Sequence, residues 1–343
     1  MTTAPQRFDN EDPALQRCYH PVCRSTDVVE GSLHAIRLCG QAWVVGRVDG
    51  APFAMIDRCP HRSSPLSAGC IVEGTVQCAY HGYRFGTDGR CTTIPALGAG
   101  AALPPKARVR VAHSVVERYG LVWLAPDDPL TGIVEVPEWD DPEFVVAPLP
   151  DQYWNAGAAQ MVDNFLDLAH FPFTHTATFG DPDDVEVPTY SVERDGLGFT
   201  CDYYHSTKVL ADSMGAEQFS VAERRSTWWY VAPFAIRLRI HYMVDDVVLT
   251  ILFFHQPIDA ATTKLYCFDL RNDIADGRTT VEDSVAFQVA VATEDKTLLE
   301  RIANKSIPLD LQAEVHTRAD RITVEMRRVL ADLVAAATAE PPG

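Results

Sequence analysis

The sequence predicts an α+β protein in which an all-β N-terminal part precedes a part that mixes strands and helices. Two groups of segments predict the sheets: short β-rich runs broken by turn residues at 18–126, and longer apolar runs at 188–270. Helical apolar spacing occurs at 160–170, 281–302 and 313–337. A chain of 343 residues has room for about two domains.

Turn residues delimit the first strands. Residues 42–48 (AWVVGRV) are apolar and β-rich, and residues 53–56 are expected to form the return strand. Asp49 and Gly50 stand between them, and this dipeptide is typical of a tight hairpin turn.

A passage rich in proline and aspartate covers residues 126–150 and is typical of a linker. We therefore predict one domain at 1–135 and a second domain at 136–343.

The charge of the chain limits its partners. Lysine and arginine number 29 and aspartate and glutamate 47, which gives a formal net charge of −18. This excludes a general binder of nucleic-acid backbones, which needs a basic surface, and it suits a soluble protein or one that docks a basic partner.

The sequence also lacks targeting and nucleotide-binding signals. It shows no Gly-rich nucleotide-binding motif, no apolar stretch long enough to span a bilayer, and no secretory signal in its polar N-terminus. We expect a cytoplasmic protein without nucleic-acid or membrane partners. Its cysteines number nine, an odd count that fits poorly with a pure disulfide framework.

Two cysteines and two histidines form the first candidate metal site. Cys59 and His61 stand in C-x-H, and sixteen residues later Cys78 and His81 stand in C-x-x-H, each pair flanked by turn residues. Four such ligands could bind zinc tetrahedrally, or a [2Fe–2S] cluster with two cysteines on one iron and two histidines on the other. Zinc fingers usually separate the cysteine pair from the histidine pair, whereas here each half holds one of each.

The residues around this motif, CPHRSSPLSAG and QCAYHGYRFGTDGRC, resemble the Rieske iron–sulfur domain, and the resemblance covers most of 15–126. It implies that Cys59 and Cys78 hold one iron of a [2Fe–2S] cluster and that His61 and His81 hold the other. The remaining seven cysteines, Cys70 and Cys91 among them, are expected to be small reduced packing residues.

The segment NFLDLAHFPFTH carries the second candidate site. Asp167 and His170 are three residues apart and would share one face of a helix. Pro172 would end that helix, so that His175 comes from the turn beyond it. Two histidines and one carboxylate with open positions form the facial triad of non-haem Fe(II) oxygenases, and a third ligand must then come from elsewhere in the chain.

The two motifs together resemble the Rieske non-haem iron oxygenases over nearly the full chain. Asp167, His170 and His175 match the D-x-x-H-x-x-x-x-H pattern of their catalytic subunits. The resemblance implies that both histidines bind Fe(II), with Asp295 in the segment VATEDKTLLERI as third ligand and Glu294 as the residue that could be confused with it.

The resemblance also assigns two residues that do not bind iron. It implies that Asp167 lies between the mononuclear iron and a Rieske histidine of a neighbouring subunit, where it would orient ligands and connect the two centres. It places Asn164 close to the iron.

The branch that the chain resembles most is that of vanillate O-demethylase and dicamba monooxygenase catalytic (α) subunits. This implies a Rieske domain followed by a helix-grip catalytic domain, a homotrimer, and a separate ferredoxin or flavin-containing reductase as electron donor. The expected activity uses O₂ to hydroxylate, or to O- or N-demethylate, a small apolar or aromatic substrate.

Other functions stay open at this point. Within the family these are arene cis-dihydroxylation and steroid hydroxylation. Outside it, the chain could be a Rieske electron-transfer protein without oxygenase activity, or a zinc-binding module.

Apolar residues near the second site are candidates for the substrate pocket. We expect the pocket to be lined by some of Phe165, Leu166, Phe179, Met214, Trp228, Trp229, Ile240, Tyr242, Leu252, Phe254 and Phe287. His205, His241 and His255 are expected to be hydrogen-bonded core or surface residues.

Overall fold

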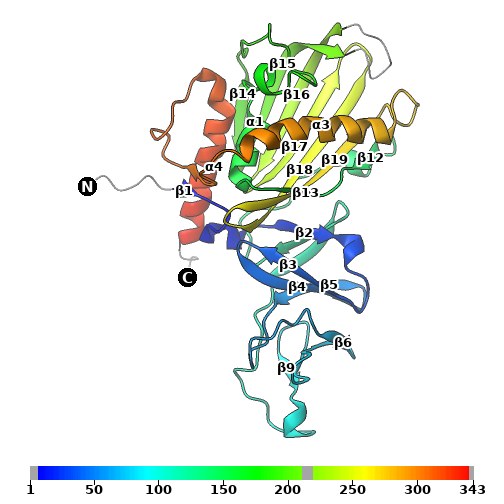
Figure 1. Ribbon diagram of the computed structural model, residues 1–343, viewed down its shortest axis with the longest axis vertical. Helices are drawn as coiled ribbons and strands as arrows, with labels where there is room; N and C mark the ends of the chain where they lie inside the picture. Colours follow the sequence, from blue (N-terminus) through cyan, green and yellow to red (C-terminus); the bar gives the residue numbers. More distant parts are fainter. Residues whose placement is uncertain (1–6, 211–218, 340–343) are drawn as a thin grey trace. The chain divides into compact units, whose positions relative to one another are not determined.

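The computed structural model describes residues 7–210 and 219–339, with side chains described in these ranges except at 206–210 and 219–222. The chain forms two compact units (Figure 1). The N-terminal unit consists of Leu15–Leu130 and Pro257–Asp259, and the C-terminal unit contains the rest of the chain. The predicted boundary between residues 135 and 136 stays a prediction.

The first residues belong to the C-terminal unit because of one short strand pairing. Strand β1 (Arg7–Phe8) pairs antiparallel with β20 (Ile307–Pro308) near the other end of the sequence. The side chain of Phe8 is fully buried and meets the ring of Phe234 edge-on.

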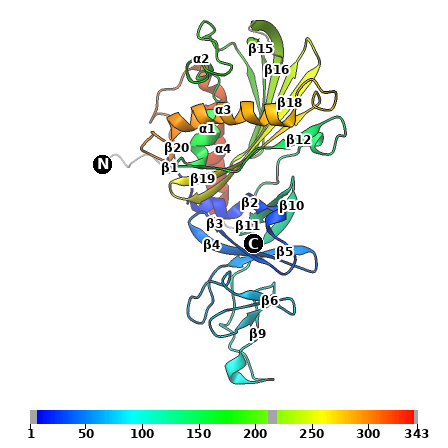
Figure 2. The ribbon, with the colours of Figure 1, turned by 45° about the vertical axis from the view of Figure 1, so that its right-hand side comes forward.

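The N-terminal unit is all-β, as the sequence predicts, and holds three small sheets. Their strands are β3 (Leu33–Leu38), β4 (Gln41–Val48) and β5 (Ala51–Ile56) in the first, β10 (Ser114–Arg118), β11 (Leu121–Ala125) and β2 (His20–Arg24) in the second, and β6 (Cys70–Val72), β7 (Thr75–Gln77), β8 (Arg84–Phe85) and β9 (Cys91–Thr93) in the third. Within this unit, the third sheet lies at one end, beyond β4 and β5 (Figure 2).

The predicted hairpin is confirmed. Strands β4 and β5 pair antiparallel across Asp49 and Gly50, which both have a positive φ, 53° and 77°. Two consecutive residues with positive φ suit the right-handed twist of a hairpin.

A hydrophobic core joins the first and third sheets of the N-terminal unit. Cys59 and Cys78 lie in this core together with the side chains of Met55, Val76 and Phe85. The backbone that carries both cysteines is therefore held by side-chain packing from two sheets.

The C-terminal unit is built on one large sheet with the strand order β12-β19-β18-β17-β16-β15-β14. Its strands are β12 (Val145–Pro148), β13 (Gln152–Trp154), β14 (Ser191–Asp195), β15 (Gly198–Leu210), β16 (Phe219–Val231), β17 (Ala235–Tyr242), β18 (Val247–Asp259) and β19 (Thr262–Arg271). The strands β14 to β19 follow one another as a meander, and β13 pairs with β19 beside β12. This sheet contains the strands that the sequence predicts at 188–270.

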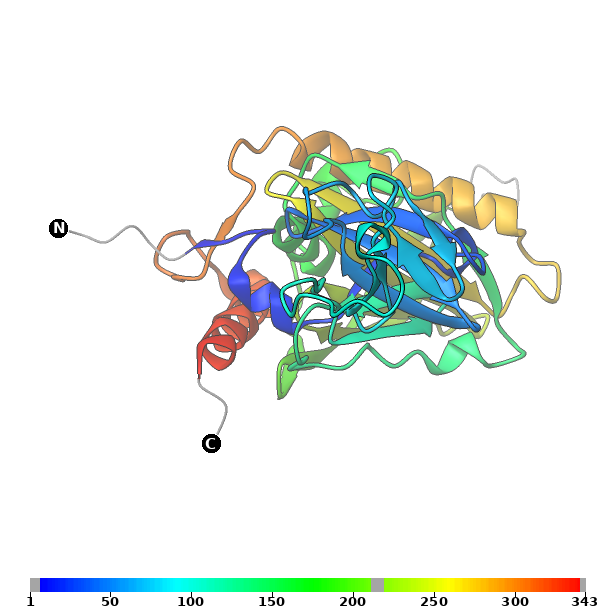
Figure 3. The ribbon, with the colours of Figure 1, turned by 90° about the horizontal axis from the view of Figure 1, so that it is seen from below.

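The described residues of the C-terminal unit form the helices α1 (Ala158–Leu166), α2 (Phe171–Thr174), α3 (Val281–Leu299) and α4 (Arg321–Thr338), of which α3 and α4 contact strands of this sheet. Helix α3 lies across the strands of the sheet, and α4 runs in a clearly different direction (Figures 1 and 3). Short 3₁₀ turns are η1 (Pro13–Arg17), η2 (Ser25–Asp27), η3 (Pro95–Leu97), η4 (Pro137–Trp139) and η6 (Arg318–Asp320). The α+β class and the helix-grip arrangement are confirmed.

Local chemistry fixes the start of α3. The hydroxyl of Thr280 accepts a hydrogen bond from the N–H of Asp283, and Glu282 and Asp283 carry negative charge in the first turn. Both features stabilise a helix N-terminus. Among the described residues, no helix has both the length and the apolar character that crossing a bilayer requires.

Two predicted segments differ from the structure. The predicted linker at 126–150 contains β12, which pairs with β19 in the large sheet, because the consecutive residues Val145 and Val146 are β-branched and fit a strand. The terminal helix begins at Arg321 and not near 313, because Thr317 caps a separate 3₁₀ turn just before it.

Candidate functional site

The two loops that carry the predicted cluster ligands have the same backbone hydrogen bonds. In each loop the cysteine N–H donates to the carbonyl five residues later, and the cysteine carbonyl accepts from the N–H four residues later. The bonds are Cys59 N–H to Ser64 O (2.8 Å), Ser63 N–H to Cys59 O (2.9 Å), Cys78 N–H to Tyr83 O (2.8 Å) and Gly82 N–H to Cys78 O (3.0 Å).

The fourth residue after each cysteine has a positive φ, 57° at Ser63 and 68° at Gly82. The loops therefore turn back on themselves in the same way, although the sequence spacing of their histidines differs by one residue. Glycine suits this conformation, whereas serine adopts it less readily.

The structure brings the four predicted cluster ligands together at these loops. Cys59 and Cys78 are almost fully buried, and burial together with the neighbouring Cys78 thiol raises the pKa of Cys59. The rings of His61 and His81 lie with their centroids 4.4 Å apart and are exposed, and Tyr83 stacks on His61. Two buried thiols and two exposed imidazoles suit a [2Fe–2S] cluster in which sulfur ligands bind one iron and nitrogen ligands bind the other.

The remaining cysteines are free thiols. Cys18, Cys23, Cys201 and Cys267 are buried, as expected of packing residues. Cys70 is exposed at the start of β6, so the expectation that it is a small buried residue is wrong.

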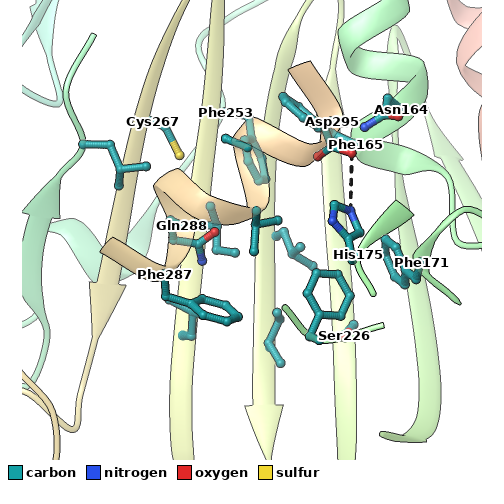
Figure 4. A pocket seen from close by; sticks show the side chains of 18 of the residues that line it. Asn164, Phe165, Phe171, His175, Ser226, Phe253, Cys267, Phe287, Gln288 and Asp295 are labelled. Carbon is teal, nitrogen blue, oxygen red and sulfur yellow. Dashed lines mark ion pairs between the residues drawn. The ribbon is translucent and has the colours of Figure 1, made fainter. Parts of the chain in front are cut away.

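The second site joins three side chains of the C-terminal unit, His170, His175 and Asp295, which we call the triad. Their ligand atoms all lie within 4.8 Å of one another. The Nε2 atoms of the two histidines are 3.1 Å apart, and Oδ1 of Asp295 lies 3.5 Å from Nε2 of His170 and 3.3 Å from Nε2 of His175. Figure 4 marks the contact between Asp295 and His175 with a dashed line.

Each histidine of the triad has a second carboxylate on its other ring nitrogen. Nδ1 of His170 lies 3.3 Å from Asp167, and Nδ1 of His175 lies 2.9 Å from Glu294. Glu294 also accepts from the hydroxyl of Thr178 at 2.7 Å. A carboxylate on Nδ1 fixes the ring and directs the Nε2 lone pair to the opposite side, as in many metal sites.

This arrangement suits a cation. When Nδ1–H donates to a carboxylate, Nε2 carries a lone pair, so the two Nε2 atoms and the Asp295 carboxylate would be three acceptors facing one point. Oδ1 of Asp295 is buried and has no hydrogen-bond partner among the described residues. Two imidazoles and one carboxylate are the donor set of a facial-triad Fe(II) site.

The close approach of histidines and carboxylates shifts the pKa values of the triad. Burial alone would lower the pKa of His170, but Asp167 and Asp295 outweigh it and raise this pKa to about 9. Burial would raise the pKa of Asp295, but the two histidines and the adjacent Asn164 amide lower it to about 2.

The chain around the triad differs in part from the prediction. Helix α1 ends at Leu166, so Asp167 and His170 lie in a turn and not on one helix face. Pro172 does not end a helix but stands in the first turn of α2, where a missing N–H is tolerated. His175 follows directly at the C-terminal end of α2, and Asn164 comes from the last turn of α1.

A pocket adjoins the triad between the large sheet and α3 (Figure 4). Its lining is mostly apolar and aromatic. Among the described residues it includes Phe165, Phe171, Phe179, Ser226, Trp228, Leu238, Ile240, Tyr242, Leu249, Ile251, Phe253, Leu265, Phe287, Val291 and Ala292, with Gln152, Asn164, Arg224 and Gln288 as polar members.

The pocket residues of the sheet follow the strand alternation. Trp228 lies opposite Leu238, which in turn lies opposite Ile251, so these three side chains share one face. Trp229 points to the other face, where the guanidinium of Arg237 lies 3.9 Å from its ring centre.

The predicted lining is therefore right for Phe165, Phe179, Trp228, Ile240, Tyr242 and Phe287. It is wrong for Trp229, Leu252 and Phe254, which lie on the other face of the sheet, and for Leu166, which is buried away from the pocket. Met214 lies outside the described residues.

The other predicted histidines make local contacts. His255 is buried, with Nδ1 2.7 Å from the Phe234 carbonyl, and His241 pairs with Asp246 at 2.7 Å. The ring of His205 is bonded to Arg224 at 2.6 Å.

Comparison with known proteins identifies the family. Residues 18–113 match the Rieske [2Fe-2S] domain, and residues 154–336 match the vanillate O-demethylase oxygenase C-terminal domain. The chain is 30% identical to methylxanthine N1-demethylase NdmA of Pseudomonas putida over 335 residues, which cover 95% of this chain and 91% of that protein.

Solved structures agree. The structure of P. putida NdmA with caffeine has a TM-score of 0.83 and 28% identity, covering 96% of this chain and 93% of that one. Dicamba monooxygenase bound to dicamba, at 22% identity and covering 95% and 99% of the two chains, has the same fold with a TM-score of 0.77.

These matches confirm the predicted family, the enzyme class and the two iron cofactors. With a Rieske [2Fe–2S] domain followed by the catalytic domain of the vanillate O-demethylase type, the chain belongs to the Rieske non-haem iron oxygenases.

Proposed function

We propose that the chain is the terminal oxygenase of a system that inserts one atom of O₂ into a small aromatic substrate, by hydroxylation or by O- or N-demethylation. The observation that carries the proposal is the triad beside an apolar, aromatic pocket, in a chain that also presents two cysteines and two histidines on paired loops. The runner-up functions, a carrier without oxygenase activity and a zinc module, leave the triad without a purpose.

The ligand assignment is part of the proposal. Cys59 and Cys78 would bind one iron of the cluster, and His61 and His81 the other. His170, His175 and Asp295 would bind the mononuclear Fe(II), since their donor atoms converge and the Oδ1 atom of Asp295 is otherwise unsatisfied. The chemistry that these bound metals supply is one-electron transfer and the activation of O₂.

The surrounding residues would hold the ligands and guard the pocket. Glu294 would keep the ring of His175 oriented through Nδ1, and Asp167 would do the same for His170. Asn164 lies beside Asp295 and lowers the pKa of its carboxyl group. The buried Nδ2 of Asn164 has no hydrogen-bond partner among the described residues, so this amide would be free to donate to a group at the triad. Phe171 and Phe179 pack against the two histidine rings and would limit the access of water.

Demethylation is supported by the relatives. The two methylxanthine demethylases of P. putida, NdmA and NdmB, cover most of the chain at 30% and 28% identity. The pocket offers aromatic walls for a flat ring and a few polar groups to orient it.

Electrons would come from another protein, a ferredoxin or a flavin-containing reductase, because the sequence contains no nicotinamide or flavin motif. The exposed His61 and His81 rings suit electron entry and exit at a surface. We further propose a homotrimer in which Asp167 connects the triad to a Rieske histidine of the neighbouring subunit. A cytoplasmic location fits nine cysteines that form no disulfide.

The decisive experiment is product analysis. The iron-loaded protein, a surrogate reductase and O₂ are incubated with methoxy-aromatic, N-methyl and steroid compounds, and products are identified by mass spectrometry. We expect formaldehyde and a demethylated ring from at least one compound of the first two groups. A cis-diol product would assign arene dihydroxylation instead.

Metal analysis separates the remaining alternatives. The oxygenase needs about three irons per chain, two in the cluster and one in the triad. About two irons per chain, with no product from any compound, would support an electron carrier. A colourless zinc protein would overturn the proposal.

A further inference from the structure

One charged side chain of the triad pocket is not explained by the metal site. Arg224 on β16 lines the pocket together with His170, His175 and Asp295. It is only 8% exposed. Apart from the triad, it is the one described lining residue that carries a full charge at neutral pH.

The sheet register places Arg224 in a polar row at one end of the pocket. It pairs with His205 on β15 and with Tyr242 on β17, so the three side chains share the pocket face. Ser226 and Trp228 follow on the same face, two and four residues further along the strand. The apolar lining thus begins directly beside the guanidinium.

The protein partner of Arg224 is uncharged. Its Nε–H donates to Nε2 of His205 at 2.6 Å. Burial and the charge of Arg224 lower the pKa of His205 to about 3, so this imidazole stays neutral and acts as an acceptor. Among the described residues, no carboxylate lies within salt-bridge distance of the Arg224 guanidinium.

The other two buried arginines form ion pairs with carboxylates. Arg237 pairs with Glu138 at 2.7 Å, and Arg327 pairs with Asp163 and with Glu314. Burying a charge without a counter-charge is costly, so proteins rarely do so without a ligand or a function. Among the described residues, Arg224 departs from this pattern, and it does so in the wall of the triad pocket.

A second hollow also touches Arg224 and contains acidic residues. Asp181, Asp184 and Glu186 line it, but Glu186 pairs with Arg318 at 2.9 Å. Phe171 and Phe179 line both hollows and stand between this acidic segment and the triad pocket. No ion pair joins these acids to Arg224 among the described residues.

We propose that Arg224 binds an anionic group of the substrate, so that the triad pocket takes an aromatic carboxylate or sulfonate and not a neutral ring. The guanidinium offers parallel N–H donors that match two oxygens of such a group. The apolar lining then holds the ring, whose reacting carbon points to the triad. This inference rests on the proposed oxygenase function and narrows its substrate.

The test measures binding and needs no turnover. Isothermal titration of the iron-loaded protein compares 4-methoxybenzoate and toluene-4-sulfonate with two neutral ligands, methyl 4-methoxybenzoate and caffeine. We expect the wild-type protein to bind the anions about 10- to 100-fold more tightly than the ester.

The variant Arg224→Gln should lose this preference, with the affinity for the anions falling about 10- to 100-fold and that for the ester unchanged. Arg225→Gln is the matched control. It removes the same charge one residue away, where the side chain points to the other face and pairs with Asp202. Arg225→Gln should leave all four affinities unchanged.

Three results would overturn the inference: equal wild-type affinity for the ester and the acid, tighter binding of caffeine than of both anions, or unchanged anion binding by Arg224→Gln. If that variant fails to fold, Arg224→Lys keeps the charge and should retain part of the anion preference. The wild-type comparison of acid and ester decides in any case. Binding without product formation would refute the proposed function and leave this inference standing.

Discussion

The two units of the chain differ in charge and in how they present their metal donors. The N-terminal unit has 12 lysine and arginine residues against 10 aspartate and glutamate residues, whereas the C-terminal unit has 17 against 37. The overall charge of −18 therefore belongs to the catalytic unit. A basic partner would be attracted to that unit, and the surface of the Rieske unit is available to partners of either sign.

The candidate metal ligands of the two units also differ in their exposure to solvent. In the Rieske unit the two cysteines are buried and both histidines face the solvent, whereas His175 and Asp295 are 1% and 3% exposed in the catalytic unit. A group that exchanges electrons with another protein has to come near a surface. A centre that activates O₂ beside a substrate has to be enclosed, since water and stray reductants would divert the reaction.

The largest expected effect tests the enclosed centre. Asp295→Ala removes the carboxylate that faces both Nε2 atoms, so the protein should lose its mononuclear iron and turnover should fall to background. The visible spectrum of the cluster should stay unchanged, because its ligands belong to the other unit. Iron retention by Asp295→Ala would transfer the ligand role to Glu294.

The reciprocal change tests the exposed centre. Cys78→Ser removes a buried thiolate from the cluster and should abolish both the cluster spectrum and turnover. The iron of the triad should remain, which electron paramagnetic resonance of a nitric oxide adduct can quantify. Simultaneous loss of both metals would show that the two units do not hold their metals independently.

A smaller effect is expected at the connection between the centres. Asp167→Asn keeps a hydrogen-bonding group near Nδ1 of His170 but removes its charge. Both metals should remain bound, and cluster oxidation during a single turnover should slow about 10- to 100-fold. Stopped-flow absorbance measures this step, and an unchanged rate would reject the connecting role of Asp167.

Glu294→Gln should have a milder effect. The amide can still accept from the His175 Nδ1–H at the 2.9 Å position, so only the charge is lost. Affinity for the mononuclear iron should fall about 10-fold, as for other residues that support a metal ligand. The comparison with Asp295→Ala, measured by iron titration, separates an orienting carboxylate from a ligand.

The smallest effect concerns the paired loops of the Rieske unit. Gly82→Ala places a Cβ at a φ of 68° and 3.1 Å from Cγ of Pro95, which should lower the free energy of unfolding by about 1–2 kcal/mol. Ser63→Gly relieves the same strain in the other loop and should be neutral or stabilising by less than about 1 kcal/mol. In denaturant titrations, the unfolding midpoint of Gly82→Ala should therefore fall, and that of Ser63→Gly should rise or stay unchanged.

Much of this organisation could be predicted from local sequence. The hairpin at Asp49 and Gly50 follows from turn chemistry, and the motif containing Cys59 and His61 is rare enough to stand out. The clustering of His170 and His175 also follows from their separation of five residues.

The sequence alone could not decide between Asp295 and Glu294 as the ligand. Adjacent residues of a helix point in directions about 100° apart, and only the positions of the two histidines show which of them faces the triad. The sequence also did not single out Arg224, because the absence of an acidic partner among the described residues depends on which strands pair across the sheet. Helix ends were misplaced near Pro172, since a proline is compatible with both the end and the start of a helix.

The alternation of side chains across the large sheet has a consequence for how such proteins diversify. Positions such as Trp228 and Ile251 line the pocket, whereas Arg237 on the reverse side of the sheet pairs with Glu138. Mutations can therefore accumulate on one side and alter what is accepted without eroding the scaffold. The P. putida methylxanthine N1-demethylase and dicamba monooxygenase, which are named for different substrates, both have this fold, as such an arrangement allows.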